Sequence, residues 1–136
     1  MSTLFGEEHV RRYRETDGEE GYIWREGATI LLLTTTGRTT GNESTTPLIF
    51  GLDGDNPVIV ASKGGAPEHP GWYRNLRKTP QVEVQIKGER FAARARDAQG
   101  EERERLWTLM NGIWPHYEEY QRKTDREIPV VVLERV

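Results

Sequence analysis

The sequence predicts an α+β fold, built as a small antiparallel barrel of six short strands with flanking helices. Three observations support this prediction. Short apolar runs recur along the chain, tight turn signals separate several of them, and only a few stretches have a helical pattern. The 136 residues (15.7 kDa) suffice for one core. We expect an N-terminal arm or helix over residues 1–27, laid over the body, and a barrel domain over residues 28–136.

Six segments have strand character: Ala28–Thr35, Pro47–Leu52, Pro57–Ser62, Val82–Ile86, Arg90–Ala95 and Ile128–Leu133. Val82–Ile86 alternates apolar with polar residues, as a half-buried strand does. Asp53-Gly54-Asp55 contains the Asp-Gly pair that is typical of a tight hairpin, and Lys87-Gly88-Glu89 provides the next turn.

Two helices are expected inside the barrel domain. The first spans Pro70–Lys78, because Pro70 suits a first helical turn and Pro80 prevents continuation. The second spans about Glu101–Ile113, where the apolar residues share one face.

Composition excludes several classes of function. The net charge of −3 argues against binding to nucleic acid or to an acidic membrane surface. The absence of cysteine excludes disulfides and thiolate sites, and the separation of His9, His69 and His116 argues against a metal site. No apolar run approaches the roughly 18 residues of a membrane span, so we expect a cytoplasmic protein without integral membrane contact. A homodimer and peripheral attachment to a membrane stay open.

Two glycine-rich loops follow apolar runs: Gly37-Arg38-Thr39-Thr40-Gly41 and Ser62-Lys63-Gly64-Gly65. Glycines that let the chain turn, free N–H groups, hydroxyls and a cation together favour binding of a phosphate or carboxylate. A polar surface hairpin is the alternative interpretation of the first loop. The presence of both loops in one small domain favours a bound anionic cofactor.

Two aromatic stretches add to this hypothesis. A helix beginning near Pro70 would point its free N–H groups at an anion, with Trp72 or Tyr73 beside an aromatic ring. Trp114, Tyr117 and Tyr120 recur every third residue, which fits either a core stripe or a lid. A tyrosine hydroxyl that reaches a pocket can donate a proton or orient a carbonyl.

Together these segments resemble the deazaflavin-dependent nitroreductase family of actinobacteria, which binds coenzyme F420 on a split β-barrel of the FMN-binding type. The resemblance covers about Ala28 to Leu133. It rests on five motifs in order: LLLTTTGRTTG, TTPLIF, VASKGGAPEHPGWYRNL, WPHYEEYQ and TDREIPVVVLE.

The resemblance implies a role for each matching position. The phosphate and polyglutamate side of the cofactor would contact Arg38, Thr39, Thr40, Ser44, Thr45, Thr46, Pro47, Leu48 and Ile49. The deazaflavin ring and its linker would run along Val60, Ala61, Ser62 and Lys63. The other side of the cofactor would be closed by Gly71, Trp72, Tyr73, Arg74 and Asn75. Tyr117 would face the ring where substrate enters, and Trp114 and Tyr120 would shape that mouth.

The implied reaction is hydride transfer from the reduced deazaflavin to an electron-poor acceptor, namely a quinone, an activated enone or a nitroaromatic compound. Ser62 and Tyr117 are the catalytic candidates, because their hydroxyls can hydrogen-bond a substrate oxygen and stabilise arriving charge. Two alternatives stay open: an FMN-dependent oxidoreductase of the same barrel type, and a non-catalytic deazaflavin carrier.

The chain departs from the family pattern at two positions. Family members commonly carry basic residues where this chain has Thr39 and Ser44, and Glu43 adds an acid. Losing two exposed cations would weaken cofactor binding by roughly 1–3 kcal/mol. Compensating cations are available at Arg38, Lys63, Arg74 and Lys78.

Overall fold

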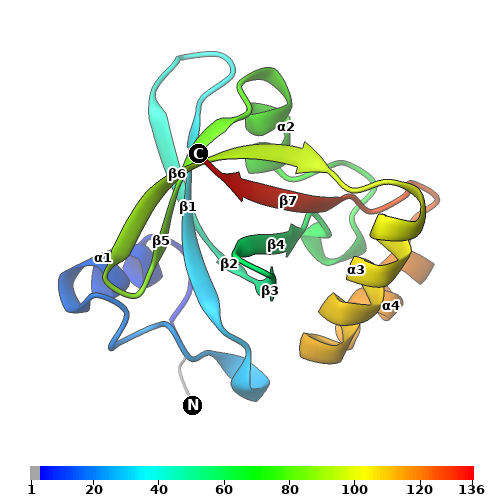
Figure 1. Cartoon of the computed structure of the whole chain (residues 1–136), viewed down its shortest axis with the longest axis horizontal. Coiled ribbons are helices and arrows are strands. Elements are labelled where there is room, and N and C mark those ends of the chain that lie inside the picture. Colours follow the sequence, from blue (N-terminus) through cyan, green and yellow to red (C-terminus); the bar gives the residue numbers. More distant parts are fainter. Residues whose placement is uncertain (1–3) are drawn as a thin grey trace.

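The computed structural model describes residues 4–136. One antiparallel sheet contains the strands β1 Ile30–Thr36, β2 Glu43–Ile49, β3 Gly51–Asp53, β4 Asn56–Val60, β5 Gln81–Ile86, β6 Glu89–Asp97 and β7 Val130–Arg135. The helices are α1 Gly6–Thr16, α2 Gly71–Lys78, α3 Gly100–Ile113 and α4 His116–Arg122, with short 3₁₀ turns η1 Arg25–Gly27 and η2 Lys63–Gly65. The predicted α+β fold with an antiparallel barrel is confirmed (Figure 1).

The sheet has seven strands where six were predicted, because the segment Pro47–Leu52 is divided at Phe50. Residues before Phe50 belong to β2 and residues after it belong to β3. The strand order is β2-β1-β5-β6-β7-β4-β3, so β2 and β3 are the two edges of the sheet. Since a single residue joins these edges in the chain, the sheet has to curl until they meet. The result is a half-barrel.

The apolar runs without alternation are strands buried on both faces. In β1, Leu31 and Leu33 lie inside the barrel, whereas Ile30 and Leu32 lie against α1. In β7, Val131 and Leu133 face the barrel interior, and the valine between them packs with the cluster that α3 and α4 form. Burial on both faces removes the period-two pattern that a half-buried strand shows.

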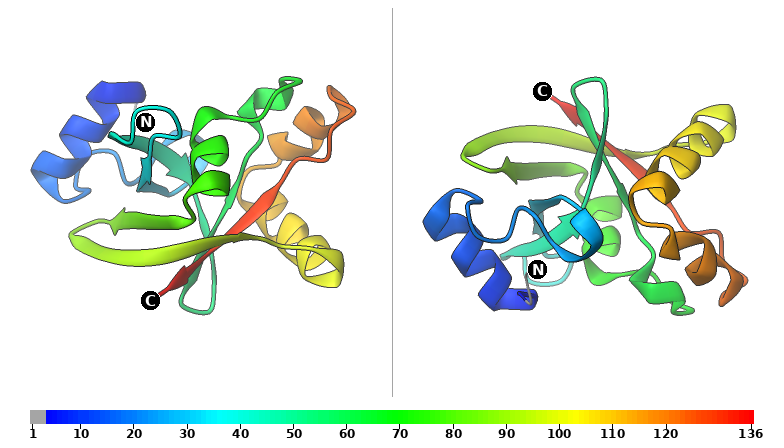
Figure 2. Two further views of the ribbon diagram at one scale, coloured as in Figure 1. Left: turned by 90° about the horizontal axis from the view of Figure 1, so that it is seen from above. Right: turned by 90° about the horizontal axis from the view of Figure 1, so that it is seen from below.

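The N-terminal segment contains α1, which a buried tyrosine attaches to the sheet. Tyr13 is 0% exposed; its hydroxyl donates to the Ile30 carbonyl at 2.9 Å and accepts from the Lys87 N–H at 2.7 Å. Burial raises the pKa of Tyr13 to about 12. The helix therefore contacts both β1 and the turn between β5 and β6, and Figure 2 shows it at the opposite end of the molecule from α3 and α4.

The helices α2 and α3 agree with the two predicted helices to within one residue. Pro70 stands at the N-cap of α2, and α3 packs on the start of β3. A side chain at Gly51 would have its Cβ 2.7 Å from Ile113 Cδ1 of α3, so glycine allows this close approach. None of the helices in residues 4–136 has the length and apolar character that a membrane span requires.

Replacing Tyr13 with phenylalanine should reduce stability by about 1–3 kcal/mol. The change leaves a buried carbonyl and a partly buried N–H without their shared partner. Urea denaturation measures the free energy of unfolding. Tyr22→Phe is the matched control, since its hydroxyl makes no hydrogen bond with residues 4–136, and it should change stability by less than about 0.5 kcal/mol. Equal effects of the two variants would contradict the role given to the Tyr13 hydroxyl.

Candidate functional site

A cavity of about 420 Å³ lies between the edge strand β2, the chain that follows β4, and three helices. Its wall is formed by Phe5, Gly6, His9, Trp24, Ile30, Thr46, Pro47, Leu48, Ile49, Val60, Ser62, Lys63, Gly64, Pro70, Trp72, Trp114, Tyr117 and Tyr120. These residues come from both ends of the chain and from its middle. The curl of the sheet brings β2 close to the end of β4.

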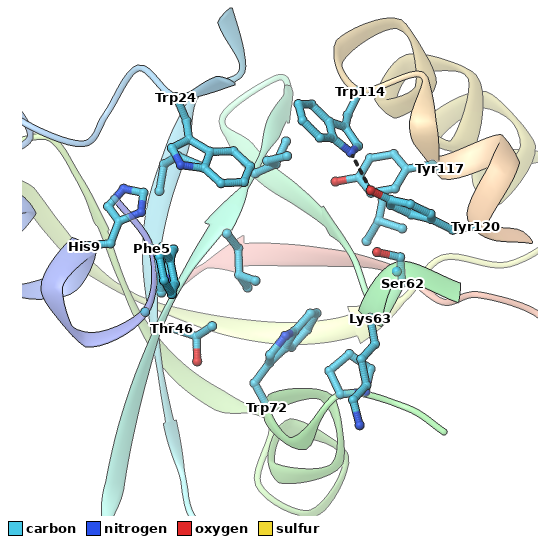
Figure 3. A pocket seen from close by; sticks show the side chains of 18 residues that line it. Phe5, His9, Trp24, Thr46, Ser62, Lys63, Trp72, Trp114, Tyr117 and Tyr120 are labelled. Atoms are coloured by element: carbon cyan, nitrogen blue, oxygen red, sulfur yellow. Dashed lines mark hydrogen bonds between the residues drawn. The ribbon is translucent and has the colours of Figure 1, made fainter. Parts of the chain in front are cut away.

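Large aromatic rings form opposite walls of the cavity (Figure 3). Trp24 and Trp114 lie together on one side, with ring centroids 5.8 Å apart, and Trp72 lies across from them. Phe5 stands on a third wall, facing the side chains of α4. Such flat, apolar walls suit a planar aromatic ligand.

Two hydroxyl groups project into the cavity from the wall opposite Phe5. Ser62 is 9% exposed and Tyr117 is 4% exposed. Burial, and then the neighbouring Tyr120, raise the pKa of Tyr117 well above its ordinary value, so the phenol keeps its proton at neutral pH. The Tyr120 hydroxyl already accepts from Trp114 Nε1 at 3.3 Å, whereas the Tyr117 hydroxyl makes no hydrogen bond with residues 4–136. Tyr117 can therefore donate to a ligand.

The first glycine-rich loop is attached to α2 by hydrogen bonds, two of them to the side-chain amide of one residue. Asn75 is buried; its Oδ1 accepts from the Arg38 N–H at 3.2 Å and from Arg38 Nη1 at 2.8 Å, and its Nδ2 donates to Thr35 Oγ1 at 3.0 Å. Arg38 Nη1 also donates to the Gly71 carbonyl at 3.2 Å. Arg38 is thus held beside the start of α2, next to cavity residues Pro70 and Trp72.

Three further cations surround this end of the site. Lys63 lines the cavity and pairs with Glu68 at 3.1 Å, and this bond lowers the pKa of the Glu68 carboxyl. Lys78 Nζ donates to the Arg38 carbonyl at 2.8 Å. Arg74 is exposed, and its guanidinium forms no hydrogen bond or ion pair in the part of the chain that the structure describes. These groups can attract an anion at the mouth of an otherwise apolar cavity.

Most of the residues predicted from the sequence lie at this site. Those that line the cavity are Thr46, Pro47, Leu48, Ile49, Val60, Ser62, Lys63, Trp72, Trp114, Tyr117 and Tyr120. Beside it, on α2 and the loop that α2 holds, are Arg38, Thr39, Thr40, Gly71, Arg74 and Asn75. Ser44 is exposed on β2, close to that loop.

Among the predicted residues outside the cavity wall, three more have side chains that are engaged elsewhere. The Thr45 hydroxyl bonds to Thr34 at 2.8 Å and to Arg14 of α1 at 2.9 Å. The Tyr73 hydroxyl donates to Asp97 Oδ2 at 2.6 Å, on the other side of α2. Ala61 is fully buried in the barrel core. Each of these residues supports the site through packing or backbone position.

The N-terminal contribution to the cavity was missed by the sequence analysis. Phe5, Gly6, His9 and Trp24 all line it, and so do Ile30, Gly64 and Pro70. His9 Nε2 donates to the Gly21 carbonyl at 2.8 Å, which fixes the ring in the wall. The available signal was the spacing of His9 and Tyr13, four residues apart on one helical face within an acidic segment.

The helix α4, which carries Tyr117 and Tyr120, rests directly on η2. Gly65 has a φ of +87°, and a Cβ there would lie 2.6 Å from the Tyr120 carbonyl oxygen. Only glycine permits this contact without displacing the helix. The second glycine-rich loop is therefore the support of α4.

Comparisons with known proteins agree with this geometry. The family model described as F420H2-dependent quinone reductase matches residues 5–135. An F420H2-dependent quinone reductase of Mycobacterium tuberculosis is 43% identical over 130 residues, covering 93% of this chain and 87% of that protein. A solved F420H2-dependent reductase has 44% identity and a TM-score of 0.72, over 77% of this chain and 93% of that one. Another solved structure, described as a domain-swapped dimer, has 41% identity and a TM-score of 0.75, and the match covers 92% of this chain and 96% of that one.

Replacing Gly65 with alanine should displace α4 and cost about 1–3 kcal/mol more than the same change at Gly64. Both glycines have positive φ, but a Cβ at Gly64 meets nothing within 4 Å. The comparison therefore isolates the contact with Tyr120 from the backbone strain. The free energy of unfolding from urea titrations measures the difference. Equal destabilisation would show that α4 does not depend on this contact.

Proposed function

Because the chain belongs to the F420H2-dependent quinone reductase family, we propose that it is an oxidoreductase that reduces a quinone with electrons from reduced coenzyme F420. The main support from the structure is the position of Ser62 and Tyr117, two buried hydroxyl groups on one wall of an aromatic cavity. This arrangement suits a planar cofactor and a planar acceptor whose oxygen needs hydrogen-bond donors.

The residues present fit the cofactor. Trp72, Val60 and the segment 46–49 would flank the ring, since they form the flat and mostly apolar part of the wall. Arg38, Arg74 and Lys63 would hold the phosphate and the glutamate tail, together with the N–H groups at the start of α2. Thr39 and Ser44 are exposed and uncharged, so tail binding would depend on these three cations.

The bound cofactor would supply the hydride. The acceptor oxygen gains negative charge as the hydride arrives, and reduction of a quinone to a hydroquinone requires one proton in addition. Tyr117 retains its proton at neutral pH and is free to donate, so it would hydrogen-bond that oxygen and supply the proton. Ser62 would donate a second hydrogen bond from the same wall.

The aromatic walls would exclude water from the reacting groups. Two aromatic residues of the N-terminal segment, Phe5 and Trp24, cover the cavity together with Trp114, which lies between α3 and α4. Exclusion of water strengthens the hydrogen bonds made to a developing charge and protects the hydride donor from side reactions.

We extend the proposal to activated enones and nitroaromatic compounds, which share an electron-poor centre and an oxygen that the same hydroxyls can contact. Trp114 narrows the cavity where it meets Trp24, which favours flat acceptors over bulky ones. The solved relative described as a domain-swapped dimer supports self-association of this chain as a further proposal.

Fluorescence titration of the protein with F420 and with FMN, followed by oxidation of F420H2 with menadione, tests the proposal. We expect saturable F420 binding and menadione-dependent oxidation that requires the protein. Saturable binding of FMN without a response to F420 would favour the FMN alternative. Tight F420 binding without turnover of any acceptor would favour a carrier protein.

Replacing Tyr117 with phenylalanine should lower kcat for menadione by about 10- to 100-fold, because the proton donor is lost. The dissociation constant for F420 should stay within about twofold, since the ring remains in place. Steady-state kinetics and fluorescence titration measure the two quantities. The control is Tyr22→Phe, outside the cavity, which should keep the kcat of the unmodified protein. Full activity of Tyr117→Phe with every acceptor would rule out the proton-donor role.

Replacing Arg38 with alanine should weaken F420 binding by about 3- to 10-fold, and by more at low ionic strength, because the contact is electrostatic. Titrations at two salt concentrations measure the effect. Arg90→Ala removes the same charge from an exposed position on β6 outside the cavity and should leave the affinity unchanged. Equal affinities of the two variants would remove Arg38 from the cofactor site.

A further inference from the structure

Arg126, in the segment before β7, holds the chain that carries Ser62. Its Nε donates to the Ala66 carbonyl at 2.9 Å, its Nη1 to the Ala61 carbonyl at 3.2 Å, and its Nη2 to the Ser62 carbonyl at 2.8 Å. We call residues 61–66 the Ser62 loop. Arg126 does not line the cavity, so it contacts this loop from behind.

The Ser62 loop needs support because its conformation is costly. Lys63, Gly64 and Gly65 all have positive φ, and for Lys63, at +47°, this conformation is strained. The strand β4 has ended at Val60, and in the loop only the Ser62 and Lys63 carbonyls accept from backbone N–H groups of the turn, at Gly65 and Ala66. The Ala61 and Ala66 carbonyls are left to Arg126. A guanidinium, planar with five donors, can bind three carbonyls at once, which the single ammonium of lysine does less well.

His69 completes the hydrogen bonds of Arg126. His69 Nδ1 lies 3.1 Å from Arg126 Nη1, and since a guanidinium only donates, Nδ1 must be the unprotonated acceptor. Protonation of Nδ1 would replace this hydrogen bond with the repulsion of two cations.

The surroundings of His69 favour its neutral form. Burial, followed by the nearby cations Arg126, Arg74 and Arg77, lowers the pKa of His69, and Asp97 opposes this shift. The remaining titratable groups that face the same polar hollow are Tyr73 of α2, Arg103 and Glu104 of α3, and Glu127 beside Arg126. The pKa of His69 therefore lies below its ordinary value of 6.5, and the ring loses its acceptor role only on acidification below that value.

We propose that Arg126 is a positioning residue that holds Ser62 in the cavity, and that neutral His69 is required for this hold. This inference rests on the proposed function of Ser62. The loop also supports α4 through Gly65, so loss of the Arg126 contacts would displace both the Ser62 hydroxyl and the helix that carries Tyr117. Displacement of a catalytic group by about 1 Å can reduce a rate by about 100-fold.

The first test compares Arg126→Ala and Arg126→Lys with Arg122→Ala. Arg122 is exposed on α4, and its guanidinium makes no hydrogen bond or ion pair in residues 4–136. We expect kcat for menadione to fall at least about tenfold in both Arg126 variants, with partial recovery of Arg126→Ala in added guanidinium. Arg122→Ala should match the unmodified protein. If Arg126→Ala does not fold, the kcat of Arg126→Lys, which keeps the positive charge, still tests whether Arg126 positions Ser62. A kcat within about twofold of the unmodified protein would overturn the proposal.

The second test separates the role of His69 from activity. The substitution His69→Asn places an amide oxygen near the position of Nδ1, so it keeps an acceptor for Arg126 but removes the group that titrates. We expect amide hydrogen exchange in residues 61–66 of the free protein, corrected for the intrinsic pH dependence, to accelerate below about pH 6.5. In His69→Asn this acceleration should be absent. His116→Asn, which removes a histidine paired with Glu26, should keep it.

These outcomes distinguish the two proposals. Exchange that does not depend on pH in the unmodified protein, or that accelerates equally in His69→Asn, would overturn the role of His69, whatever the catalytic activity. Failure of the unmodified protein to oxidise F420H2 would instead overturn the proposed function, because the exchange measurement needs no cofactor.

Discussion

The single residue between β2 and β3 is the constraint on which the rest of the structure depends. Phe50 joins the two edge strands of one sheet, so the sheet has to close on itself. The cavity is a consequence of this closure. Residues 46–49 belong to the edge strand β2. Val60 is the last residue of β4, which lies next to the other edge strand, and Ser62 comes two residues later. All of these residues line the same cavity. In a flat sheet these two groups would lie on strands far apart.

Local patterns were sufficient to predict most elements of this fold. The Asp-Gly pair at 53–54, the alternation in Val82–Ile86 and the two prolines around α2 each depend on neighbours in the chain, and each prediction agrees with the structure. The division at Phe50 could not be predicted in the same way. The apolar character of Leu48, Ile49 and Phe50 is continuous, and only the change of pairing partner, from β1 for β2 to β4 for β3, decides that β2 ends before Phe50.

Local sequence patterns also predicted only part of the candidate site. Residues in compact motifs, such as Ser62-Lys63 and Trp114 to Tyr120, were found because glycine, proline and aromatic spacing mark them. The wall made by Phe5, His9 and Trp24 was missed, because the spacing of His9 and Tyr13 marks only a helical face, and nothing local connects that face with Phe5 or Trp24. Arg126 was missed for another reason: its partners are backbone carbonyls, which every sequence contains, and only the fold brings them together.

The two catalytic candidates share one support. Ser62 lies on the loop that Arg126 holds by its carbonyls, and Tyr117 lies on α4, which packs on Gly65 of the same loop. Neither residue is itself part of a strand, since Ser62 follows the end of β4 at Val60 and Tyr117 belongs to α4. A rigid pair of donors therefore depends on a strained loop and on the charged residue behind it. Strain at such a place is tolerated when the surrounding contacts hold it, and a half-buried guanidinium that donates to three carbonyls and one imidazole meets that requirement.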